Sequence, residues 1–235
     1  MHRIILIETS TALCSTALSE DGKTISSRES DTPRAHAAMT APFIKEMLDE
    51  KGISVADCDA VCVSAGPGSY TGLRVGASTA KGLCFASGKP LLSINTLDVL
   101  VQQALDDNLV PEGCSCVVPM IDARRMEVYS AIYEICPDRR GFRRLTEIEP
   151  VIVDADSFAD KLAEGQVLFI GDGAAKCAGV ITSANASFVQ LCPNAAAMSS
   201  LAEKLLNEKK FEDTAYFEPF YLKQFVATTS RKKLF

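Results

Sequence analysis

The sequence predicts an α/β protein whose two halves form similar lobes. Each half begins with strand, tight turn, strand, turn and strand, and then continues with alternating helices and strands. Hydrophobic residues make up 47% and charged residues 23% of the 235, the balance of a globular chain that can bury two cores. We therefore expect two α/β lobes of duplicated topology, residues 1–106 and 107–235, facing each other across a cleft.

The first half alternates short apolar runs with turn residues and helical periodicities. Asp21 and Gly22 form a hairpin turn, Gly52 ends the first helix, and Thr96 is expected to cap the third. The expected strands are residues 4–8, 14–18, 23–29, 60–64 and 90–94, and the expected helices are residues 35–51, 73–86 and 96–105.

The second half restarts the same order at residue 117, with turns expected at 122–125 and 138–141. Its tail, residues 216–235, is expected to be extended and ends with Arg231, Lys232 and Lys233. The expected strands are residues 117–121, 126–133, 147–152, 167–170 and 188–191, and the expected helices are residues 157–163, 174–181 and 195–209.

Charge and cysteine content exclude several classes of protein. The 24 basic and 30 acidic residues give a net charge of −6, which argues against a protein that binds nucleic acid on its own. It does not argue against one that binds nucleic acid together with a basic partner protein. The nine cysteines, odd in number and without a CxxC pair, favour free buried thiols in a reducing cytoplasm over a metal site at Cys114 and Cys116. No apolar run is long enough for a membrane span, so we expect a cytoplasmic location.

The turn after the first strand is the first candidate site. Glu8, Thr9, Ser10 and Thr11 offer hydroxyl and backbone N–H groups that can hold a phosphate, and Glu8 can hold magnesium through water. A plain hairpin with satisfied hydroxyls is the alternative, and spacing alone favours it.

A glycine-rich connector between a buried strand and a helix is the second candidate. Its N–H groups gather at a helix N-terminus, where an anion is stabilised, although it lacks the final Gly-Lys-Ser/Thr of a Walker loop. A purely structural connector with an exposed Arg74 stays open as the alternative. The residues of this segment are Pro67, Gly68, Ser69, Tyr70, Thr71, Gly72 and Arg74.

Small residues on the helix expected at 73–86 are the third candidate. Short side chains let another helix approach closely, and the preceding helix offers adaptable methionines. Packing on the protein's own sheet and docking of a partner helix both fit the pattern. The residues concerned are Met39, Phe43, Met47, Leu73, Gly76, Ala77 and Ala80.

Two turns of the second half complete the candidates. Asp122 can face the cleft opposite Glu8, beside Arg124 and Arg125, although a solvated hairpin is slightly favoured. The turn at 171–173, with Gly171 and Gly173, can pack against a nucleoside or be an ordinary connection. No Ser-His-Asp or Cys-His arrangement can be assembled, so we expect neither a catalytic residue nor a metal ligand.

Three segments carry a resemblance to a known family. ILIETST, AGPGSYTGLRVGASTAKGL and PMIDARRMEVYSAIY resemble the TsaB (YeaZ) family of bacterial tRNA threonylcarbamoyladenosine biosynthesis, most strongly over residues 4–135. The resemblance implies an actin-like, hexokinase-like (ASKHA) fold. It implies work beside a catalytic paralogue, TsaD, and an ATPase, TsaE, which together modify the adenosine next to the tRNA anticodon. Older labels for this superfamily are glycoprotease and peptidase.

The resemblance also implies that the chain is not the catalyst. The catalytic paralogue carries an HxxxH metal motif, whereas this chain has His36 followed by Thr40. Family members associate through their first two helices, here about residues 35–51 and 73–86, so we expect a homodimer when alone, a heterodimer with the paralogue, and tRNA contact only through the complex. The alternatives are a small-molecule kinase of the same fold and a peptidase-like hydrolase.

A nucleotide site is expected to be weak or lost. By the resemblance, the phosphate and nucleoside positions fall on Glu8, Thr9, Ser10, Asp122, Gly171 and Gly173. Glu8 stands where Asp is more typical, and the turns that would bind phosphate contain few glycines. We therefore expect no cofactor on the isolated chain, with ATP or ADP and magnesium bound only in the complex.

Overall fold

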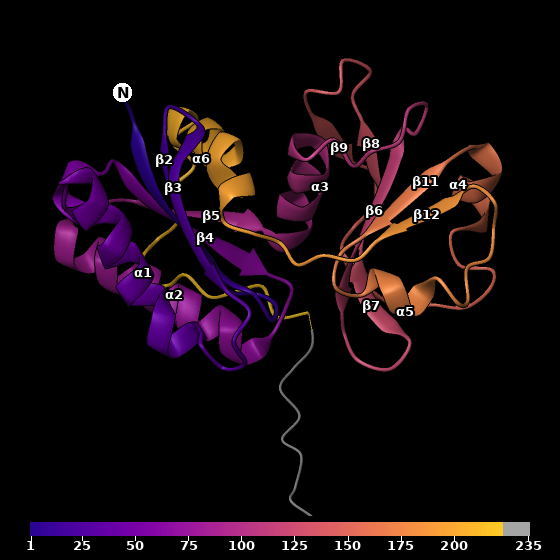
Figure 1. Ribbon diagram of the computed structural model, residues 1–235, viewed down its shortest axis with the longest axis horizontal. Helices are drawn as coiled ribbons and strands as arrows, with labels where there is room; N and C mark the ends of the chain where they lie inside the picture. Colours follow the sequence, from indigo (N-terminus) through magenta and orange to yellow (C-terminus); the bar gives the residue numbers. More distant parts are fainter. Residues whose placement is uncertain (223–235) are drawn as a thin grey trace, which may run out of the picture.

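A computed structural model describes residues 1–222 and consists of two lobes, each built on a β-sheet (Figure 1). The expected basic residues 231–233 lie outside the described residues. The first sheet contains β1 (Arg3–Glu8), β2 (Cys14–Glu20), β3 (Lys23–Ser30), β4 (Ala60–Gly66) and β5 (Leu91–Asn95). The second contains β6 (Cys116–Asp122), β7 (Glu127–Ser130), β8 (Tyr133–Ile135), β9 (Phe142–Arg144), β10 (Glu149–Ile152), β11 (Val167–Ile170) and β12 (Ala186–Val189).

The two sheets share one topology. The first has the strand order β3-β2-β1-β4-β5, and the main path of the second is β10-β7-β6-β11-β12. In the first sheet, β1 pairs antiparallel with β2 and parallel with β4, and in the second, β6 likewise pairs antiparallel with β7 and parallel with β11. The short strands β8 and β9 are an addition to the second sheet. The predicted duplication is therefore confirmed at the level of strand order and direction.

Alternation along β1 places the first sheet between two layers of helices. Successive strand side chains point to opposite faces. Ile5 and Ile7 pack with the helices α1 (His36–Lys51) and α2 (Tyr70–Ser87), which lie side by side in Figure 1. Ile4 and Leu6 pack on the opposite face with the 3₁₀ turn η2 (Ala196–Met198) and with α6 (Ser199–Asn207). The central strand is thus buried on both faces.

Two helices cross between the halves of the chain. The helix α3 (Thr96–Asp106) packs in the core of the second sheet, whereas α6 packs on the first sheet. The two crossings touch, because the backbone N–H of Asn194 donates to Gln103 Oε1 at 3.2 Å. The strands of each half of the sequence therefore form one sheet, whereas α3 and α6 each pack on the sheet of the other half. The domain boundary between residues 106 and 107 stays a prediction.

Helix starts in the first half differ from the expectation. The second helix begins at Tyr70, because the side chain of Ser69 accepts a hydrogen bond from Gly72 N and caps it. The cap of α3 is Asn95, whose side chain accepts from Leu97 N at 3.0 Å. Thr96, expected to be that cap, instead shares a 2.8 Å hydrogen bond with the hydroxyl of Ser64.

The second half deviates mainly in element length. The strand expected at residues 126–133 divides into β7 and β8, because β7 pairs with β10 and β8 pairs with β9. The remaining helical segments are η1 (Val55–Asp57), α4 (Ala159–Glu164) and α5 (Ala174–Cys177). All nine cysteines are free, and six of them are buried, as expected of structural thiols. Among residues 1–222, no helix is long and apolar enough to cross a membrane.

Candidate functional site

A cleft of about 1110 Å³ lies between the two lobes and joins candidate segments that the sequence analysis treated separately. Its walls include residues from the turn after β1, the start of α1, the first turn of α2 and the turn after β6. The lining residues include Ser10, Thr11, His36, Gly68, Ser69, Tyr70, Gly72, Asp122 and Asp172. Duplicated topology explains this convergence, because equivalent turns of the two sheets meet at the same opening.

The turn after β1 and the start of α2 are interlocked. Thr9 Oγ1 donates a 2.8 Å hydrogen bond to Gly72 O, and Ser69 N donates to Ser10 O at 2.6 Å. A Cβ on Gly72 would lie 2.0 Å from Thr9 O, and one on Gly68 would lie 2.4 Å from Ser10 O. The glycines of the connector therefore permit a close approach of the two backbones, and this agrees with the alternative of a purely structural connector.

The expected loop is also shorter than predicted. Tyr70, Thr71 and Gly72 belong to the first turn of α2 rather than to a loop. Arg74 is exposed, as the structural alternative expects, and its guanidinium carbon lies 4.0 Å from the centre of the Tyr70 ring. Tyr70 in turn contacts Tyr221, with ring centres 4.9 Å apart.

Glu8 is fully buried behind the cleft. Its Oε1 accepts a 2.6 Å hydrogen bond from Ser10 N, while its Oε2 has no hydrogen-bond partner among residues 1–222. Burial raises the pKa of the Glu8 carboxyl, and the charge of Asp172 adds in the same direction. Glu8 does not line the cleft, and its Oε1 is already used by Ser10 N. The residues of this turn therefore do not fit a magnesium ion held by Glu8.

Unpartnered polar atoms gather at this side of the cleft. Within residues 1–222, four of the five buried side-chain polar atoms that lack a partner belong to Glu8, Ser10, Thr11 and His36. The last three residues line the cleft directly. Because a buried polar group without a partner is costly, these atoms fit a polar ligand in the cleft.

The opposite wall carries charges that compensate one another. Asp122 N donates to Asp172 Oδ1 at 2.8 Å, and Lys176 Nζ contacts Asp122 Oδ1. Burial and the neighbouring Asp122 charge raise the pKa of Asp172 to about 6. Asp122 therefore lies at the cleft as expected, but its carboxylate is already paired with an ammonium group.

The glycines of the second-lobe turn serve packing. A Cβ on Gly171, whose φ is +133°, would lie 2.2 Å from Met120 O. Gly173 N donates to the same carbonyl at 2.9 Å. The turn at 171–173 thus holds Asp172 against β6, and its packing against a nucleoside stays a prediction.

Sequence reasoning missed the residues that enter the cleft from the end of the described chain. Phe220, Tyr221 and Leu222 line it. Phe220 N donates to Ala65 O at 2.7 Å, which attaches this segment to the end of β4. Local periodicity carries no signal for such a contact, because it depends on the chain returning from α6 across the first lobe.

The residues expected at a helix–helix interface are mostly internal. Six of the seven are buried in the lobe itself, and Met39 is half-buried. Gly76 illustrates the cause, since a Cβ there would lie 2.4 Å from Thr9 Oγ1. This corrects their expected place at the surface. The buried six are Phe43, Met47, Leu73, Gly76, Ala77 and Ala80.

A different set of residues forms the outer surface of α2. Ser78, Gly82 and Phe85 recur at helical spacing and define what we call the outer stripe. Phe85 is 90% exposed, and a Cβ on Gly82 would meet no atom of residues 1–222 within 4 Å outside the surrounding helix turns. The outer stripe is therefore an accessible surface of small side chains that ends in an aromatic ring.

Comparisons with known proteins agree with this architecture. A protein-family model described as TsaD, tRNA N6-adenosine threonylcarbamoyltransferase, matches residues 27–230. The tRNA threonylcarbamoyladenosine biosynthesis protein TsaB of Escherichia coli (strain K12) is 31% identical over 96% of both chains. The TsaB protein of Haemophilus influenzae is 30% identical over 94% of this chain and 93% of its own. The crystal structure of an uncharacterized Pseudomonas aeruginosa protein with similarity to peptidase YeaZ has a TM-score of 0.82 and 27% identity, over 95% of this chain and 100% of that one.

The duplicated sheets and the cleft between them define a protein of the actin-like, hexokinase-like fold class, as the resemblance implied. Within that class, the chain belongs to the TsaB family of tRNA threonylcarbamoyladenosine biosynthesis proteins. The resemblance carried by the three sequence segments is thereby confirmed.

Proposed function

We propose that the chain is a non-catalytic subunit of the machinery that makes threonylcarbamoyladenosine in tRNA. In this proposal it docks on a TsaD-like catalytic paralogue through the outer surfaces of α1 and α2. The same surface pairs two copies when the chain is alone, so the two assemblies compete by mass action. A TsaE-like ATPase and the tRNA join through the complex, in keeping with the net charge of −6.

The outer stripe is the observation that carries this proposal. Glycine inside a helix costs about 1 kcal/mol relative to alanine, so it needs a compensating reason. Gly76 has one inside the lobe, because Thr9 lies against it, whereas Gly82 faces open space. Close approach of a partner helix would supply that reason for Gly82 and would cover the exposed ring of Phe85.

The histidine content supports a non-catalytic role. The chain has two histidines in 235 residues, and one of them, His36, lines the cleft. One helical turn later stands Thr40, a buried residue whose hydroxyl donates to His36 O at 2.6 Å. A pair of imidazoles one turn apart, as in an HxxxH metal motif, therefore has no counterpart on α1.

Charge placed on the outer stripe tests docking. We expect Gly82→Glu to abolish homodimer formation and co-purification with a TsaD-like paralogue, while circular dichroism stays that of the wild type. Ala184→Glu adds the same charge at an exposed residue of the second lobe and should keep both assemblies. Unchanged pairing of Gly82→Glu by light scattering contradicts the proposed surface. Threonylcarbamoyl transfer by the purified chain alone contradicts the non-catalytic role.

The unpartnered atoms of the cleft favour a second, weaker binding function. Ser10, Thr11 and His36 offer donors and acceptors to a phosphate or nucleoside, whereas Glu8 and the Lys176-paired Asp122 are poorly suited to hold magnesium. We therefore propose a nucleotide affinity weaker than about 10 μM for the isolated chain. Calorimetry with ATP and magnesium tests it, and tighter binding that Ser10→Ala removes would favour an enzyme of the same fold, such as a small-molecule kinase.

A further inference from the structure

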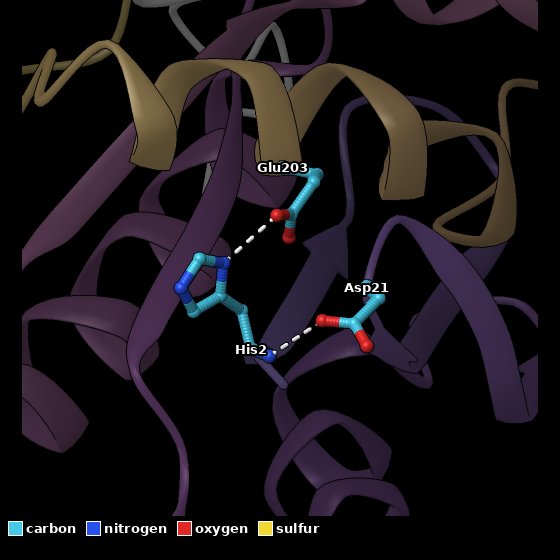
Figure 2. A group of neighbouring side chains, drawn as sticks. All are labelled: His2, Asp21 and Glu203. Carbon is cyan, nitrogen blue, oxygen red and sulfur yellow. Dashed lines mark hydrogen bonds and ion pairs between the residues drawn. The ribbon is translucent and has the colours of Figure 1, made fainter.

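We propose that His2, Asp21 and Glu203 form a site for one divalent transition-metal ion, with zinc as the best chemical match. The three residues come from separate parts of the first lobe (Figure 2). His2 directly precedes β1, Asp21 lies in the turn between β2 and β3, and Glu203 lies on α6. One ligand atom from each residue lies within 4.8 Å of the other two.

The donor geometry is close to that of a metal site. His2 Nδ1 and Glu203 Oε1 are 2.8 Å apart, and Asp21 Oδ1 accepts a 2.8 Å hydrogen bond from His2 N. Ligands of a tetrahedral zinc ion lie about 3.4 Å from one another, since each bond is about 2.1 Å long. Because the three donors already lie within 4.8 Å of one another, rotations of the Asp21 and Glu203 side chains toward the imidazole would bring them to this spacing.

An unpartnered oxygen points to a missing ligand. Glu203 Oε1 is approached by two groups, His2 Nδ1 and the Asn207 side-chain amide at 3.0 Å. Glu203 Oε2, by contrast, is buried and has no hydrogen-bond partner. Within residues 1–222 it is the fifth such atom, and the other four belong to Glu8, Ser10, Thr11 and His36. A cation beside Glu203 would remove the cost of leaving that oxygen unpaired.

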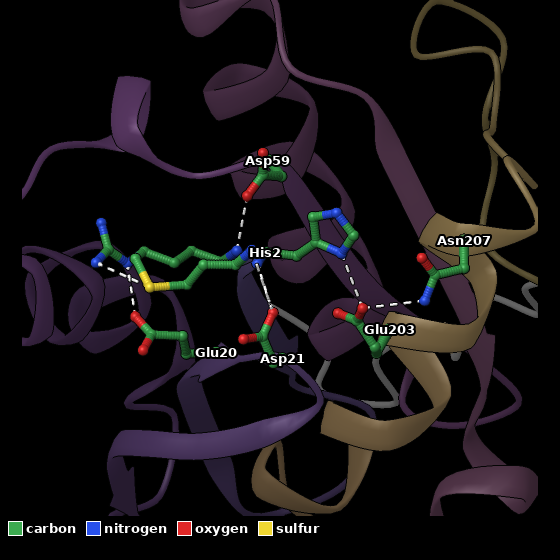
Figure 3. Close-up of polar contacts among 8 residues, drawn as sticks. His2, Glu20, Asp21, Asp59, Glu203 and Asn207 are labelled. Atoms are coloured by element: carbon green, nitrogen blue, oxygen red, sulfur yellow. Dashed lines mark hydrogen bonds and ion pairs between the residues drawn. The ribbon is translucent and has the colours of Figure 1, made fainter.

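The surrounding acids are already engaged, which limits the ligand set to three side chains. Glu20 and Asp59, both labelled in Figure 3, each accept a hydrogen bond from Arg3. The Arg3 guanidinium donates to Glu20 at 2.9 Å, and its backbone N–H donates to Asp59 at 2.7 Å. Three protein ligands leave a fourth position for water. The imidazole favours zinc, cobalt or nickel over calcium and magnesium, which prefer all-oxygen sites.

Such an ion would attach α6 to the segment that directly precedes β1. Gly22 lies against α6, because a Cβ there would be 3.3 Å from Glu203 Cβ. The ion would cross-link His2 to Glu203, which are 201 positions apart in the sequence. Since the three donors converge only in the folded chain, binding would raise the midpoint of thermal unfolding.

Metal titration of the full chain tests the site. We expect calorimetry with zinc chloride to give one ion per chain, and cobalt chloride to give the visible absorption of a tetrahedral ion. His2→Gln keeps a donor toward Glu203 but removes the imidazole, and Asp21→Asn keeps the acceptor for His2 N. Each should weaken zinc binding at least about tenfold and cancel the rise in the unfolding midpoint. Glu208→Gln, at the exposed C-cap of the same helix, should bind zinc like the wild type.

Three results would overturn the proposal. The first is no saturable zinc binding below about 1 mM. The second is wild-type affinity in His2→Gln, which would leave the histidine with a hydrogen-bonding role. The third is a sulfur-to-cobalt charge-transfer band in the near ultraviolet, which would assign the ion to cysteines.

Discussion

The Thr9 hydroxyl donates a 2.8 Å hydrogen bond to the carbonyl of Gly72 and so joins the turn after β1 to the first turn of α2. Ser69 N reaches Ser10 O beside it. These two contacts bring two backbones together on one wall of the cleft, which is possible because Gly72 has no side chain. The shape of that wall therefore depends on a glycine outside the turn itself.

Gly72→Ala should destabilise the protein. Its Cβ would lie 2.0 Å from Thr9 O, and neither backbone can move without breaking the contacts around the turn. We expect the free energy of unfolding in urea to fall by about 3 kcal/mol. Gly82→Ala on the same helix is the matched control, and should raise it by about 1 kcal/mol because its Cβ enters open space. Equal effects of the two substitutions would disprove this account.

Ala80→Glu should disrupt the lobe rather than only an assembly. Ala80 is 0% exposed and packs among the apolar residues between α2 and the first sheet. A buried carboxylate without a partner costs several kcal/mol, so we expect loss of cooperative unfolding by circular dichroism. A folded monomer that merely fails to dimerise would contradict the burial described here.

The difference between Gly76 and Gly82 shows where sequence reasoning ends. Both are glycines of one helix, and a small residue on that helix fits either packing on the protein's own sheet or docking of a partner helix. Spacing reports that a position is small, but not whether the protein's own sheet or a partner covers it. The fold separates them, because Thr9 lies against Gly76, whereas no atom of residues 1–222 outside the surrounding helix turns would lie within 4 Å of a Cβ on Gly82.

Contacts between segments far apart in the sequence could likewise not be predicted from local sequence patterns. The strands of the first sheet follow from β-branched runs and turn residues, and their duplication follows from the order of elements. The entry of Tyr221 into the cleft does not, because it depends on α6 packing on the first sheet. The turns after β1 and β6 could be named as candidates from their residue types, but their meeting at one cleft required the fold.

Tyr133→Phe should weaken the contact between α3 and the second sheet. Tyr133 is fully buried, and its hydroxyl donates to Asp98 Oδ1 at 2.6 Å. Burial raises the pKa of Asp98, and losing the donor would leave that carboxyl without its partner. We expect the free energy of unfolding to fall by about 1–3 kcal/mol in guanidinium denaturation. An unchanged midpoint would show that the hydrogen bond contributes nothing to stability.

Because of Asp172, the free energy of unfolding should fall as pH rises through the mildly acidic range. Its pKa is about 6 in the folded chain against the ordinary 3.8, so the folded state binds the proton more tightly than the unfolded state does. The contribution is therefore complete below about pH 4 and is lost as pH rises through about 6. Asp172→Asn should flatten this part of the stability profile, while its amide oxygen can still accept from Asp122 N. Parallel profiles for the two proteins would refute the shift.

Thiol labelling should distinguish buried from accessible cysteines. Burial raises the pKa of Cys58 and of Cys84 to about 11, so neither should form the reactive thiolate at neutral pH. Cys116, Cys136 and Cys192 are partly accessible, but burial raises the pKa of Cys116 to about 11 as well. We therefore expect mass spectrometry after brief treatment with iodoacetamide to find modification confined to Cys136 and Cys192. All nine should react in guanidinium. Rapid labelling of Cys62 in the native protein would contradict its burial.

The contact between Asn194 and Gln103 has a mechanical consequence. The polypeptide passes from one lobe to the other at α3 and again before η2, and this hydrogen bond fastens the two passages together. Paired, adjoining connections act as a pivot: they resist sliding of one lobe past the other and permit rotation that widens or narrows the opening opposite them. A molecule that binds to both turns of the cleft would therefore fix the angle between the two lobes. A protein that binds to the outer stripe contacts only the first lobe and would not fix that angle.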